Sequence, residues 1–410
     1  MGERNWAGNH TYRARAVRRP RSVDELQDLV ASHDRVRALG SRHSFTDLAD
    51  TDGILVSLED LPVALEVDET RRSATVTGGT TFHTLGQQLD REGWALATLA
   101  SLPHISVAGA IATGTHGSGR HVKSLAGLVS ALDLVGPDGE LRRVQRGDPD
   151  FAGSVVNLGG LGVVTRVTLD VVPTFDLWQL VWLDLPWDPV TSDFEALMGS
   201  GYSVSLFTDW TGATVSQVWV KGLVDVPPPD LSPARRAASA VHMIPGMSSD
   251  AVTGQLGVPG PWHEQLPHFR PSSTPSSGIE LQSEYLVPIA HAGEAISRLR
   301  TRAELFTAVL QVSEIRTVAA DDLWLSAAYG ADVVALHFTW QPDSEAVYAV
   351  LPELERMLLP LGARPHWGKC FTASRSELAA AYPMIDRFKE LRDRSDPTRK
   401  FDNAFLHRVL

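Results

Sequence analysis

The sequence predicts an α+β protein made of two domains, and three observations support this. Strand and helix patterns alternate over about the first 170 residues, and glycine, proline and aspartate mark the turns between them. From residue 173 the composition changes, because tryptophans become frequent and prolines cluster at 227–229. Strand and helix patterns then alternate again between residues 280 and 359, which predicts a second sheet covered by helices.

The first domain is predicted to span residues 1–172. A capping box at 22–25 begins a helix in which Leu26, Leu29 and Val30 recur at helical spacing. A short strand begins at Val36. Further along, the patterns predict a strand at 53–58, a hairpin of 63–67 with 73–77, a helix at 80–91, a hairpin of 125–135 with 140–144 and a strand at 163–172.

The second domain is predicted to span residues 173–375, and a C-terminal segment covers 376–410. Strands are expected at 202–210, 280–287, 312–318 and 333–340, and helices at 292–310 and 344–359. The closing segment contains a predicted helix at 376–382.

Composition and charge exclude several classes of partner. Of the 410 residues 43% are hydrophobic and 21% charged, which is typical of a globular protein with a large core. A net charge of -12 and a pI near 5.6 argue against nucleic acid or an anionic membrane as partner and favour a neutral or cationic substrate. Cys370 is the only cysteine, so no intramolecular disulfide forms. No run of about 20 apolar residues occurs, so we expect a cytoplasmic protein.

The segment from Val36 to Phe45 predicts an anion-binding loop. It begins as a buried strand and stops at Gly40, and the residues that follow are small or polar, so their N–H groups can point at a phosphate-bearing cofactor. His43 lies inside this run. Taken alone, a Gly-Ser turn before a histidine is also typical of a strand end with a solvated side chain.

A second segment, residues 100–119, is rich in glycine, alanine and hydroxyl side chains. Its glycines, Gly109, Gly114, Gly117 and Gly119, let a backbone approach a large flat ligand closely. The segment is not a dinucleotide fingerprint of the usual kind, because no G-x-G-x-x-G opens a helix near the N-terminus with an acidic residue about 20 positions later.

Together, 40–44 (Gly-Ser-Arg-His-Ser), 101–109 (Ser-Leu-Pro-His-Ile-Ser-Val-Ala-Gly) and 112–117 (Ala-Thr-Gly-Thr-His-Gly) resemble the flavin-binding half of the vanillyl-alcohol-oxidase family. Within that family the chain is similar to the alditol oxidases from Asn5-Trp6-Ala7-Gly8-Asn9 to Lys400-Phe401-Asp402-Asn403-Ala404-Phe405. The resemblance implies an FAD-binding α+β domain, an α+β substrate domain with an antiparallel sheet, and a C-terminal segment that returns to the FAD domain.

The resemblance also implies one FAD per chain, bound covalently through His43 to the 8-methyl group of the isoalloxazine. Ala100 matches the position that controls access of O2 to the flavin. One departure is Arg42, because many relatives carry glycine there. The residues implied to hold the cofactor with His43 are Ala38, Leu39, Gly40, Ser41, Arg42, Ser44, Ala100, Ser101, Ser106, Gly109, Thr113, Gly114, Thr115, His116 and Val164.

Two predicted strands carry pairs of polar residues on one face. Glu314 and Arg316 lie two residues apart, as do His337 and Thr339, so each pair shares a face. Such pairs are also typical of the polar outer face of a half-solvated sheet. The resemblance implies that the substrate is bound by Ser101, Glu314, Arg316, Thr339 and Lys369, and that the catalytic residues are Lys369, Arg316, His337 and Glu314.

Other kinds of site were compared with this one. His104, His116 and His121 lack the spacing of metal ligands, so no metal is expected. No G-x-S-x-G elbow of a serine hydrolase occurs. Two alternatives stay open: an aldonolactone oxidase or dehydrogenase of the same family, and a non-catalytic flavin- or sugar-binding protein. The matches at 100–104, 314–317 and 337–340 favour the alditol side.

The function implied by the resemblance is oxidation of the terminal C1 hydroxyl of linear polyols to the aldose, with O2 reduced to hydrogen peroxide. Xylitol and sorbitol are the expected substrates, with glycerol as a further candidate. The partners would be a small-molecule polyol and O2, without nucleic acid or membrane, and the chain would be a monomer.

Overall fold

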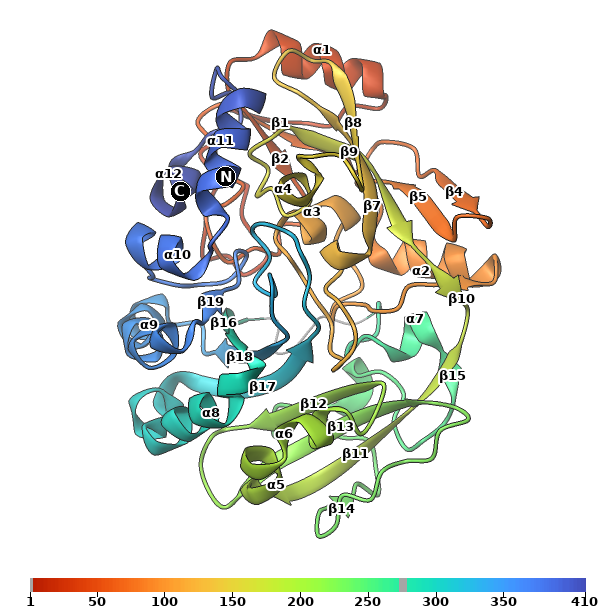
Figure 1. Cartoon of the computed structure of the whole chain (residues 1–410), viewed down its shortest axis with the longest axis vertical. Coiled ribbons are helices and arrows are strands. Elements are labelled where there is room, and N and C mark those ends of the chain that lie inside the picture. The colour runs from red at the N-terminus through yellow and green to blue at the C-terminus, as the bar shows by residue number, and fades with distance from the viewer. Residues whose placement is uncertain (1–2, 273–278) are drawn as a thin grey trace.

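The computed structural model describes residues 3–272 and 279–410 (Figure 1). Near its N-terminus lies a parallel sheet in the order β1-β3-β2, formed by β1 (Ala16–Arg18), β2 (Val36–Leu39) and β3 (Ile54–Ser57). Helix α1 (Val23–Ser32) packs Leu26 and Val30 against this sheet. It begins at Ser22, whose hydroxyl accepts a hydrogen bond from Glu25 N at 3.1 Å. The Glu25 carboxylate accepts from Arg21 N, so only half of the predicted capping box forms.

The second sheet of this half is antiparallel, in the order β4-β5-β9-β7-β8. Its strands are β4 (Leu65–Asp68), β5 (Ser73–Thr77), β7 (Val129–Val135), β8 (Leu141–Gln145) and β9 (Val163–Asp170). The helices beside it are α2 (Phe82–Arg91), α3 (Val107–Ala112) and α4 (Phe151–Ser154), with a 3-10 turn η1 (Ala126–Leu128). A short ladder of β6 (Trp94–Ala95) with β10 (Val172–Pro173) leads into the rest of the chain.

The third large unit is a nine-stranded sheet, in which every pairing is antiparallel. Its order is β14-β11-β13-β12-β17-β18-β16-β19, with β15 on β11. The strands are β11 (Asp176–Pro186), β12 (Ser203–Thr208), β13 (Thr214–Leu223), β14 (Arg235–Arg236), β15 (Gly260–Pro261), β16 (Leu281–Pro288), β17 (Leu310–Val318), β18 (Val333–Trp340) and β19 (Arg364–Pro365).

Helices cover one face of this sheet (Figure 1). They are α5 (Trp187–Ser192), α6 (Phe194–Met198), α8 (Ala292–Thr301) and α9 (Ser344–Leu358), while α7 (Trp262–Gln265) lies against α2. Short 3-10 turns are η2 (Ser249–Ala251), η3 (Ile289–His291), η4 (Ala303–Leu305), η5 (Thr307–Val309) and η6 (Leu359–Leu361). In the core beneath the helices the rings of Phe338 and Trp340 stack with centroids 5.2 Å apart. Because side chains alternate along β18, the residues between and beside these two point to the other face of the sheet.

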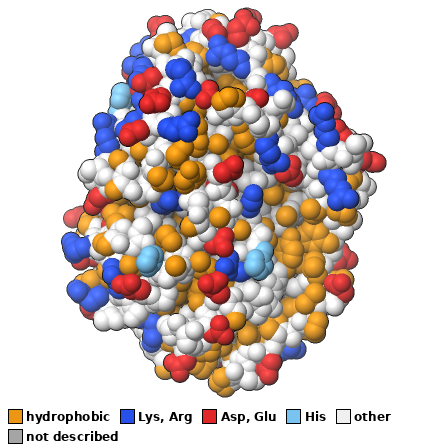
Figure 2. All heavy atoms as spheres, viewed as in Figure 1, with side chains coloured by type: hydrophobic (Ala, Val, Ile, Leu, Met, Phe, Trp, Pro, Cys, Tyr) orange, Lys and Arg blue, Asp and Glu red, His pale blue; other side chains and the backbone are white. Residues whose placement is uncertain are grey.

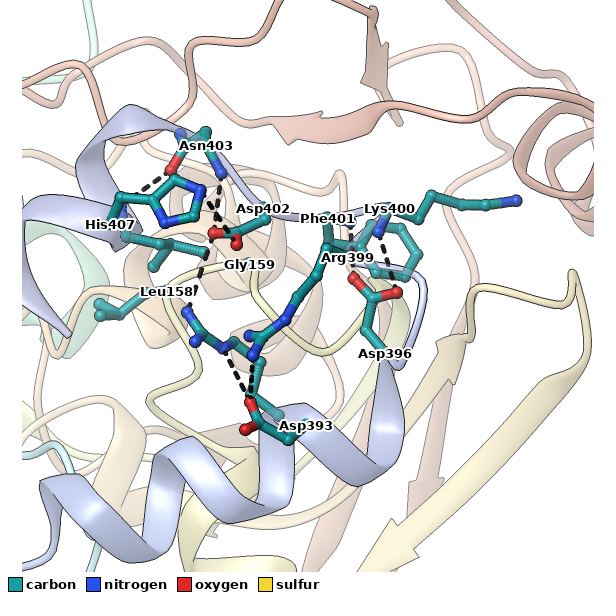
Figure 3. Close-up of polar contacts among 12 residues, drawn as sticks. Leu158, Gly159, Asp393, Asp396, Arg399, Lys400, Phe401, Asp402, Asn403 and His407 are labelled. Carbon is teal, nitrogen blue, oxygen red and sulfur yellow. Dashed lines mark hydrogen bonds and ion pairs between the residues drawn. The ribbon is translucent and has the colours of Figure 1, made fainter.

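The C-terminal helices α10 (Arg375–Ala381), α11 (Ile385–Ser395) and α12 (Ala404–Val409) lie beside the N-terminal half (Figure 1). Figure 3 shows the segment between α11 and α12, where Asp396 accepts hydrogen bonds from Lys400 N and Phe401 N. The buried guanidinium of Arg37 joins this segment to the rest, donating to the carbonyls of Phe401 at 2.8 Å and Gly159 at 2.9 Å. These bonds tie the end of the chain to β2 and to residues that line the cavity described below.

The predicted α+β fold with an antiparallel sheet in its second half is confirmed. The differences lie in where the elements begin and end. The helix predicted at 292–310 ends at Thr301, because the chain then forms the turns η4 and η5, which bury Phe306 and let β17 begin at Leu310 opposite Trp340. Pairing within the sheet here outweighs helical propensity. The hairpin predicted at 125–135 begins as η1, and its strand begins at Val129. The helices α11 and α12 were not predicted.

Candidate active site

A cavity of about 500 Å³ is lined by both halves of the molecule. Its walls include the loop after β2, residues 100–116 around α3, residues 157–164, which lead into the start of β9, and the strands β16, β17 and β18. The strands β17 and β18 and Lys369 carry the residues predicted to bind substrate, and the loop and the α3 segment carry those predicted to bind the cofactor. The cavity therefore brings the two predicted parts of the site together.

The loop of residues 40–44 provides one wall of the cavity. Ser41 Oγ accepts a hydrogen bond from Ser106 N at 2.5 Å, and a Cβ atom on Gly40 would lie 2.8 Å from Ser106 Oγ. Among the described residues none accepts a hydrogen bond from the backbone N–H groups of Ser41 to Ser44. The loop is thus packed closely enough to need glycine at position 40, and its N–H groups remain available to an anion.

Relatives are expected to carry glycine at the position of Arg42, and the backbone conformation of Arg42 explains why glycine is preferred there. Its φ angle is 63°, in the left-handed region that favours glycine. Its Nε lies 2.8 Å from Glu3 Oε1, and its carbonyl accepts a hydrogen bond from Trp6 N at 2.8 Å. The guanidinium is therefore held by the N-terminal segment.

The glycine-rich segment folds as α3 and the turn that ends it. A Cβ atom on Gly109 would lie 2.8 Å from Ser106 Oγ, so this segment and the 40–44 loop meet around one serine. The hydroxyls of Thr113 and Thr115 lie 3.3 Å apart, and both residues line the cavity. Gly114 was also predicted to contact the cofactor, but it is absent from the lining; its φ of 71° ends the helix in a left-handed turn.

His43 lies in the cavity wall between two aromatic neighbours. Its ring centroid is 5.3 Å from that of Trp6 and 5.4 Å from that of His104. Burial, and then the nearby His104, lower the pKa of His43 to about 4. The imidazole is therefore neutral near pH 7 and keeps a free lone pair.

Polar side chains form a row across the three central strands. In the register of the sheet, His337 on β18 lies opposite Glu314 on β17 and also opposite Glu284 on β16. Thr339, two residues further along β18, lies opposite Gln282 in the same way. All five residues line the cavity. The side-chain alternation that sends Phe338 and Trp340 into the core thus presents this row to a ligand.

Glu284 is the centre of the charges in this row. Its carboxylate lies 2.6 Å from Arg316 Nη2, 2.9 Å from Lys369 Nζ and 3.4 Å from His116 Nε2, and the residue is 1% exposed. Burial alone would raise the pKa of Glu284, but Lys369, His116 and Arg316 hold it well below its usual range. Burial in turn lowers the pKa of Lys369, and Glu284 opposes that effect. The result is an ionised carboxylate that holds two cations in a buried site.

Glu314 has a different set of partners. Its Oε1 lies 2.7 Å from His268 Nε2 and its Oε2 lies 3.4 Å from Arg316 Nε. Burial would raise the pKa of Glu314, but Arg316 and His268 hold it far below its usual range. Arg316 Nη1 also lies 3.4 Å from Ser101 Oγ, which joins the α3 segment to the sheet. Glu314 is therefore a fixed acceptor at neutral pH.

His337 presents an imidazole that makes no hydrogen bond to the described residues. Neither ring nitrogen has a hydrogen-bond partner within residues 3–272 and 279–410. Burial and then Lys369 lower its pKa well below the usual value, although Glu284 opposes them. It is thus a neutral imidazole whose nitrogens are open to a ligand.

Apart from Gly114, every predicted site residue lines the cavity: Ala38, Leu39, Gly40, Ser41, Arg42, His43, Ser44, Ala100, Ser101, Ser106, Gly109, Thr113, Thr115, His116, Val164, Glu314, Arg316, His337, Thr339 and Lys369. Lining residues that sequence reasoning missed include Glu284, Gln282 and His268. Glu284 and Gln282 lie two residues apart on a predicted strand, so the rule applied to Glu314 and Arg316 would have found them. His268 lies in the loop after α7, outside any regular element, and carried no such signal.

The lining fits FAD in its chemistry. The 40–44 loop offers free N–H groups for a pyrophosphate, and Thr113 and Thr115 add hydroxyls. Small side chains such as Ala38, Ala100 and Val164 line the same space, and they leave room for a flat ring system. The neutral His43 lies within this wall.

Comparison with known proteins first identifies the class. Residues 14–145 match the family model described as FAD binding domain, and residues 280–409 match the model described as D-arabinono-1,4-lactone oxidase. Among solved structures, a solvent-stable cholesterol oxidase shares the fold with a TM-score of 0.80 at 17% identity over 98% of this chain and 96% of that one. The cholesterol oxidase from B. sterolicum gives a TM-score of 0.80 at 16% identity over 99% and 96%. The protein is an FAD-dependent oxidoreductase with the vanillyl-alcohol-oxidase fold.

Two relatives then identify the family. The alditol oxidase of Streptomyces sp. strain IKD472 is 48% identical over 99% of this chain and 98% of its own length. The L-gulono-1,4-lactone dehydrogenase of Mycobacterium tuberculosis strain H37Rv is 30% identical over the same shares of the two chains. The chain belongs to the alditol oxidase family.

Within residues 3–272 and 279–410, no helix combines the length and apolar character needed to cross a bilayer. The same residues contain no group of three or more His, Cys, Asp and Glu side chains placed to share a metal ion. Acidic and basic side chains are interspersed on the face shown in Figure 2, and no single-sign patch covers it. Nothing on that face resembles a basic surface for nucleic acid.

Proposed function

We propose that the protein oxidises the terminal C1 hydroxyl of linear polyols such as xylitol and sorbitol, with glycerol as a further candidate. The product is the aldose, and O2 is reduced to hydrogen peroxide. The observation that carries this proposal is a set of polar groups that shares one cavity with the 40–44 loop: the buried Glu314, Arg316 and Thr339 and the half-buried Ser101 and Lys369. The 48% identity to an alditol oxidase supports it.

A polyol is neutral and strongly hydrated, and its binding requires fixed polar groups that replace water. The carboxylate of Glu314 accepts hydrogen bonds from neighbouring hydroxyls, since both His268 and Arg316 hold it ionised and in place. Ser101 and Thr339 each supply a hydroxyl that both donates and accepts. This set orients C1, and a displacement of about 1 Å would reduce the rate on the order of a hundredfold.

FAD held by the 40–44 loop and the α3 segment would supply the acceptor for the hydride from C1 and the donor of two electrons to O2. The charges of this chain act on the substrate oxygen. Negative charge develops on that oxygen as the hydroxyl proton leaves, and the cations of Arg316 and Lys369 stabilise it in a site with little water. Glu284 keeps both cations in position at 2.6 and 2.9 Å.

His337 is the proposed proton acceptor. It is buried and neutral, and both of its ring nitrogens lack a partner among the described residues. Once it gains the proton, the carboxylates of Glu284 and Glu314 on the two neighbouring strands stabilise the imidazolium. Lys369, whose pKa is lowered by burial, is the second candidate for this role.

We further propose that one FAD is attached covalently through His43 and that the enzyme acts as a monomer. The attachment is supported by the neutral imidazole of His43 in the cavity wall, next to the loop whose N–H groups are free. A neutral ring nitrogen is the nucleophile that such a bond requires.

Oxidation of a sugar lactone is the second candidate function. Residues 280–409 match the model described as D-arabinono-1,4-lactone oxidase, and these residues contain β16, β17 and β18 of the site. A lactone presents a ring hydroxyl, whereas a linear polyol spreads its hydroxyls along the row of polar side chains.

A substrate screen separates these candidates. Oxygen uptake and peroxide formation are measured with xylitol, sorbitol, glycerol and a sugar lactone at equal concentrations. We expect the highest kcat/KM with a polyol and one peroxide per O2 consumed. Faster turnover of the lactone would establish the second function. Flavin-loaded protein that consumes no O2, and whose flavin none of the four compounds reduces under anaerobic conditions, would be a binding protein.

A further inference from the structure

A buried chain of hydrogen bonds leads from Glu314 away from the cavity. His268 Nε2 lies 2.7 Å from Glu314 Oε1, and Lys221 Nζ lies 3.3 Å from His268 Nδ1. The ammonium of Lys221 also donates to the carbonyls of Leu266 at 2.5 Å and Pro267 at 2.9 Å. Lys221 is 1% exposed, and no carboxylate among the described residues lies within ion-pair distance of it. A lysine buried in this way needs all three of its acceptors.

These contacts determine which nitrogen of His268 carries the proton. An ammonium group has no lone pair, so His268 Nδ1 must accept from Lys221. The proton of the neutral ring is then on Nε2, where it donates to Glu314. Burial lowers the pKa of His268 to about 4 and that of Lys221 to about 7. Near pH 6 the imidazole of His268 is therefore neutral and the ammonium of Lys221 is charged.

The surroundings of His268 hold its ring in one orientation. Its centroid lies 5.3 Å from that of Trp219 and 5.7 Å from that of Phe207, both in edge-to-face geometry. The backbone N–H groups of His268 and Phe269 both donate to the carbonyl of Ser101 at 3.2 Å. One loop thus supports two residues proposed to bind substrate, Ser101 from the α3 segment and Glu314 from β17.

We propose that Lys221 and His268 are positioning residues for substrate selection: Lys221 fixes the tautomer of His268, and His268 fixes the carboxylate of Glu314 as a pure hydrogen-bond acceptor for polyol hydroxyls. This inference rests on the proposed function. Lys221 lies outside the cavity lining, and we argue that the effect of both residues on the substrate passes through one oxygen of Glu314.

Two variants of His268 separate positioning from packing. In His268→Gln the side-chain amide replaces Nε2 and still donates to Glu314, whereas in His268→Asn the shorter amide replaces Nδ1 and reaches only Lys221. We expect His268→Asn to raise the KM for xylitol about ten- to a hundredfold, the range for losing a hydrogen bond to a charged group. The rate of flavin reduction at saturation should change less, and His268→Gln should stay close to the parent.

If both variants match the parent in KM, or if both are impaired equally at full flavin content, the inference is overturned. In the first case His268 does not act on Glu314, and in the second it only fills space.

Lys221 is tested by a spectroscopic measurement that needs no substrate. Nitrogen-15 spectra of the histidine-labelled, flavin-loaded protein at pH 6 should show His268 protonated at Nε2, with assignment from His268→Gln. In Lys221→Met the nitrogen-15 chemical shifts of the His268 ring should no longer be those of a single tautomer. An unchanged Nε2–H signal in that variant would overturn the role of Lys221. If the parent fails to oxidise any polyol, the proposed function fails while the tautomer measurement still decides whether the chain of hydrogen bonds exists.

Discussion

The half-buried Lys369 and the buried Glu284 form an ion pair, with Nζ 2.9 Å from Oε2, at the point where the two halves of the site meet. The other oxygen of the same carboxylate receives Arg316 at 2.6 Å. One carboxylate therefore holds two cations beside the cavity, and removing either cation leaves Glu284 less compensated. Variants that remove either cation are therefore informative about the role of this carboxylate and its partners.

Lys369→Ala and Arg316→Ala should each slow flavin reduction at saturating xylitol, by about a hundredfold, because each removes a cation from the developing charge on C1 oxygen. Anaerobic stopped-flow measurement of flavin bleaching gives this rate directly. Lys389→Ala on α11 and Arg143→Ala on β8 remove exposed ion pairs and serve as matched controls. Reduction of both site variants at the parent rate would show that these residues only bind.

Arg316→Lys should not restore the rate, because a point charge cannot contact Glu284, Glu314 and Ser101 together as the guanidinium does.

Thr339→Ala should weaken polyol binding with little effect on the saturated reduction rate. Thr339 presents a neutral hydroxyl, which contributes to the ground state and the transition state alike. Titration of the flavin spectrum with substrate should show a dissociation constant raised about fivefold, the effect of one neutral hydrogen bond. Thr339→Ser retains the hydroxyl and should bind like the parent. A fall in rate without a change in affinity would place Thr339 in the chemical step.

Ala100 is buried in the cavity wall, and from the family resemblance we propose that it controls access of O2 to the flavin. Ala100→Leu should slow flavin reoxidation more than flavin reduction, and Ala100→Gly should be tolerated. Mixing the anaerobically reduced protein with buffer of known O2 content measures reoxidation alone. Equal reoxidation rates in the two variants would place the O2 path elsewhere.

The proposed bond between His43 and FAD predicts that the flavin survives denaturation. After acid precipitation and a denaturing gel, the parent band should fluoresce under ultraviolet light, and the His43→Ala band should be dark. His104→Ala removes the neighbouring imidazole and keeps His43, so its band should stay fluorescent. A dark parent band with flavin in the supernatant would contradict covalent attachment.

Acid should destabilise the fold through its buried histidines. Burial lowers the pKa of His268 to about 4, and burial with Lys369 lowers that of His366 to about 3. Between these values and the unfolded pKa near 6.5 the unfolded chain binds more protons, so stability present above pH 6.5 is lost as the pH falls towards 4. The loss is on the order of a few kcal/mol for each histidine.

Urea unfolding of the flavin-loaded protein between pH 7.5 and 4.5 measures this loss. His366→Asn keeps an acceptor for Gly368 N and should flatten the slope. His291→Asn, at an exposed position, should leave the slope unchanged. If the stability of His366→Asn falls with pH as steeply as that of the parent, His366 does not contribute to the acid destabilisation.

Local patterns in the sequence were sufficient for much of the fold. Side-chain alternation places His337 and Thr339 on one face of β18 and Phe338 and Trp340 on the other, and it needs only the period of a strand. The helix start at Ser22 follows from the hydroxyl of that residue. The end of α8 at Thr301 could not be read in this way, because it depends on where β17 must pair with β18.

The sequence by itself determined the family, the fold class and the residue types of the site, because strand period, cap chemistry and motif spacing are local properties of the chain. Only the tertiary structure decided which charges meet. Glu284 and the three residues that it contacts, His116, Arg316 and Lys369, come from four separate segments. The chain of Lys221, His268 and Glu314 crosses from β13 through a loop to β17. Such contacts depend on the order of strands in the sheet and on how two halves of the chain close around one cavity, and no spacing along the sequence encodes that order.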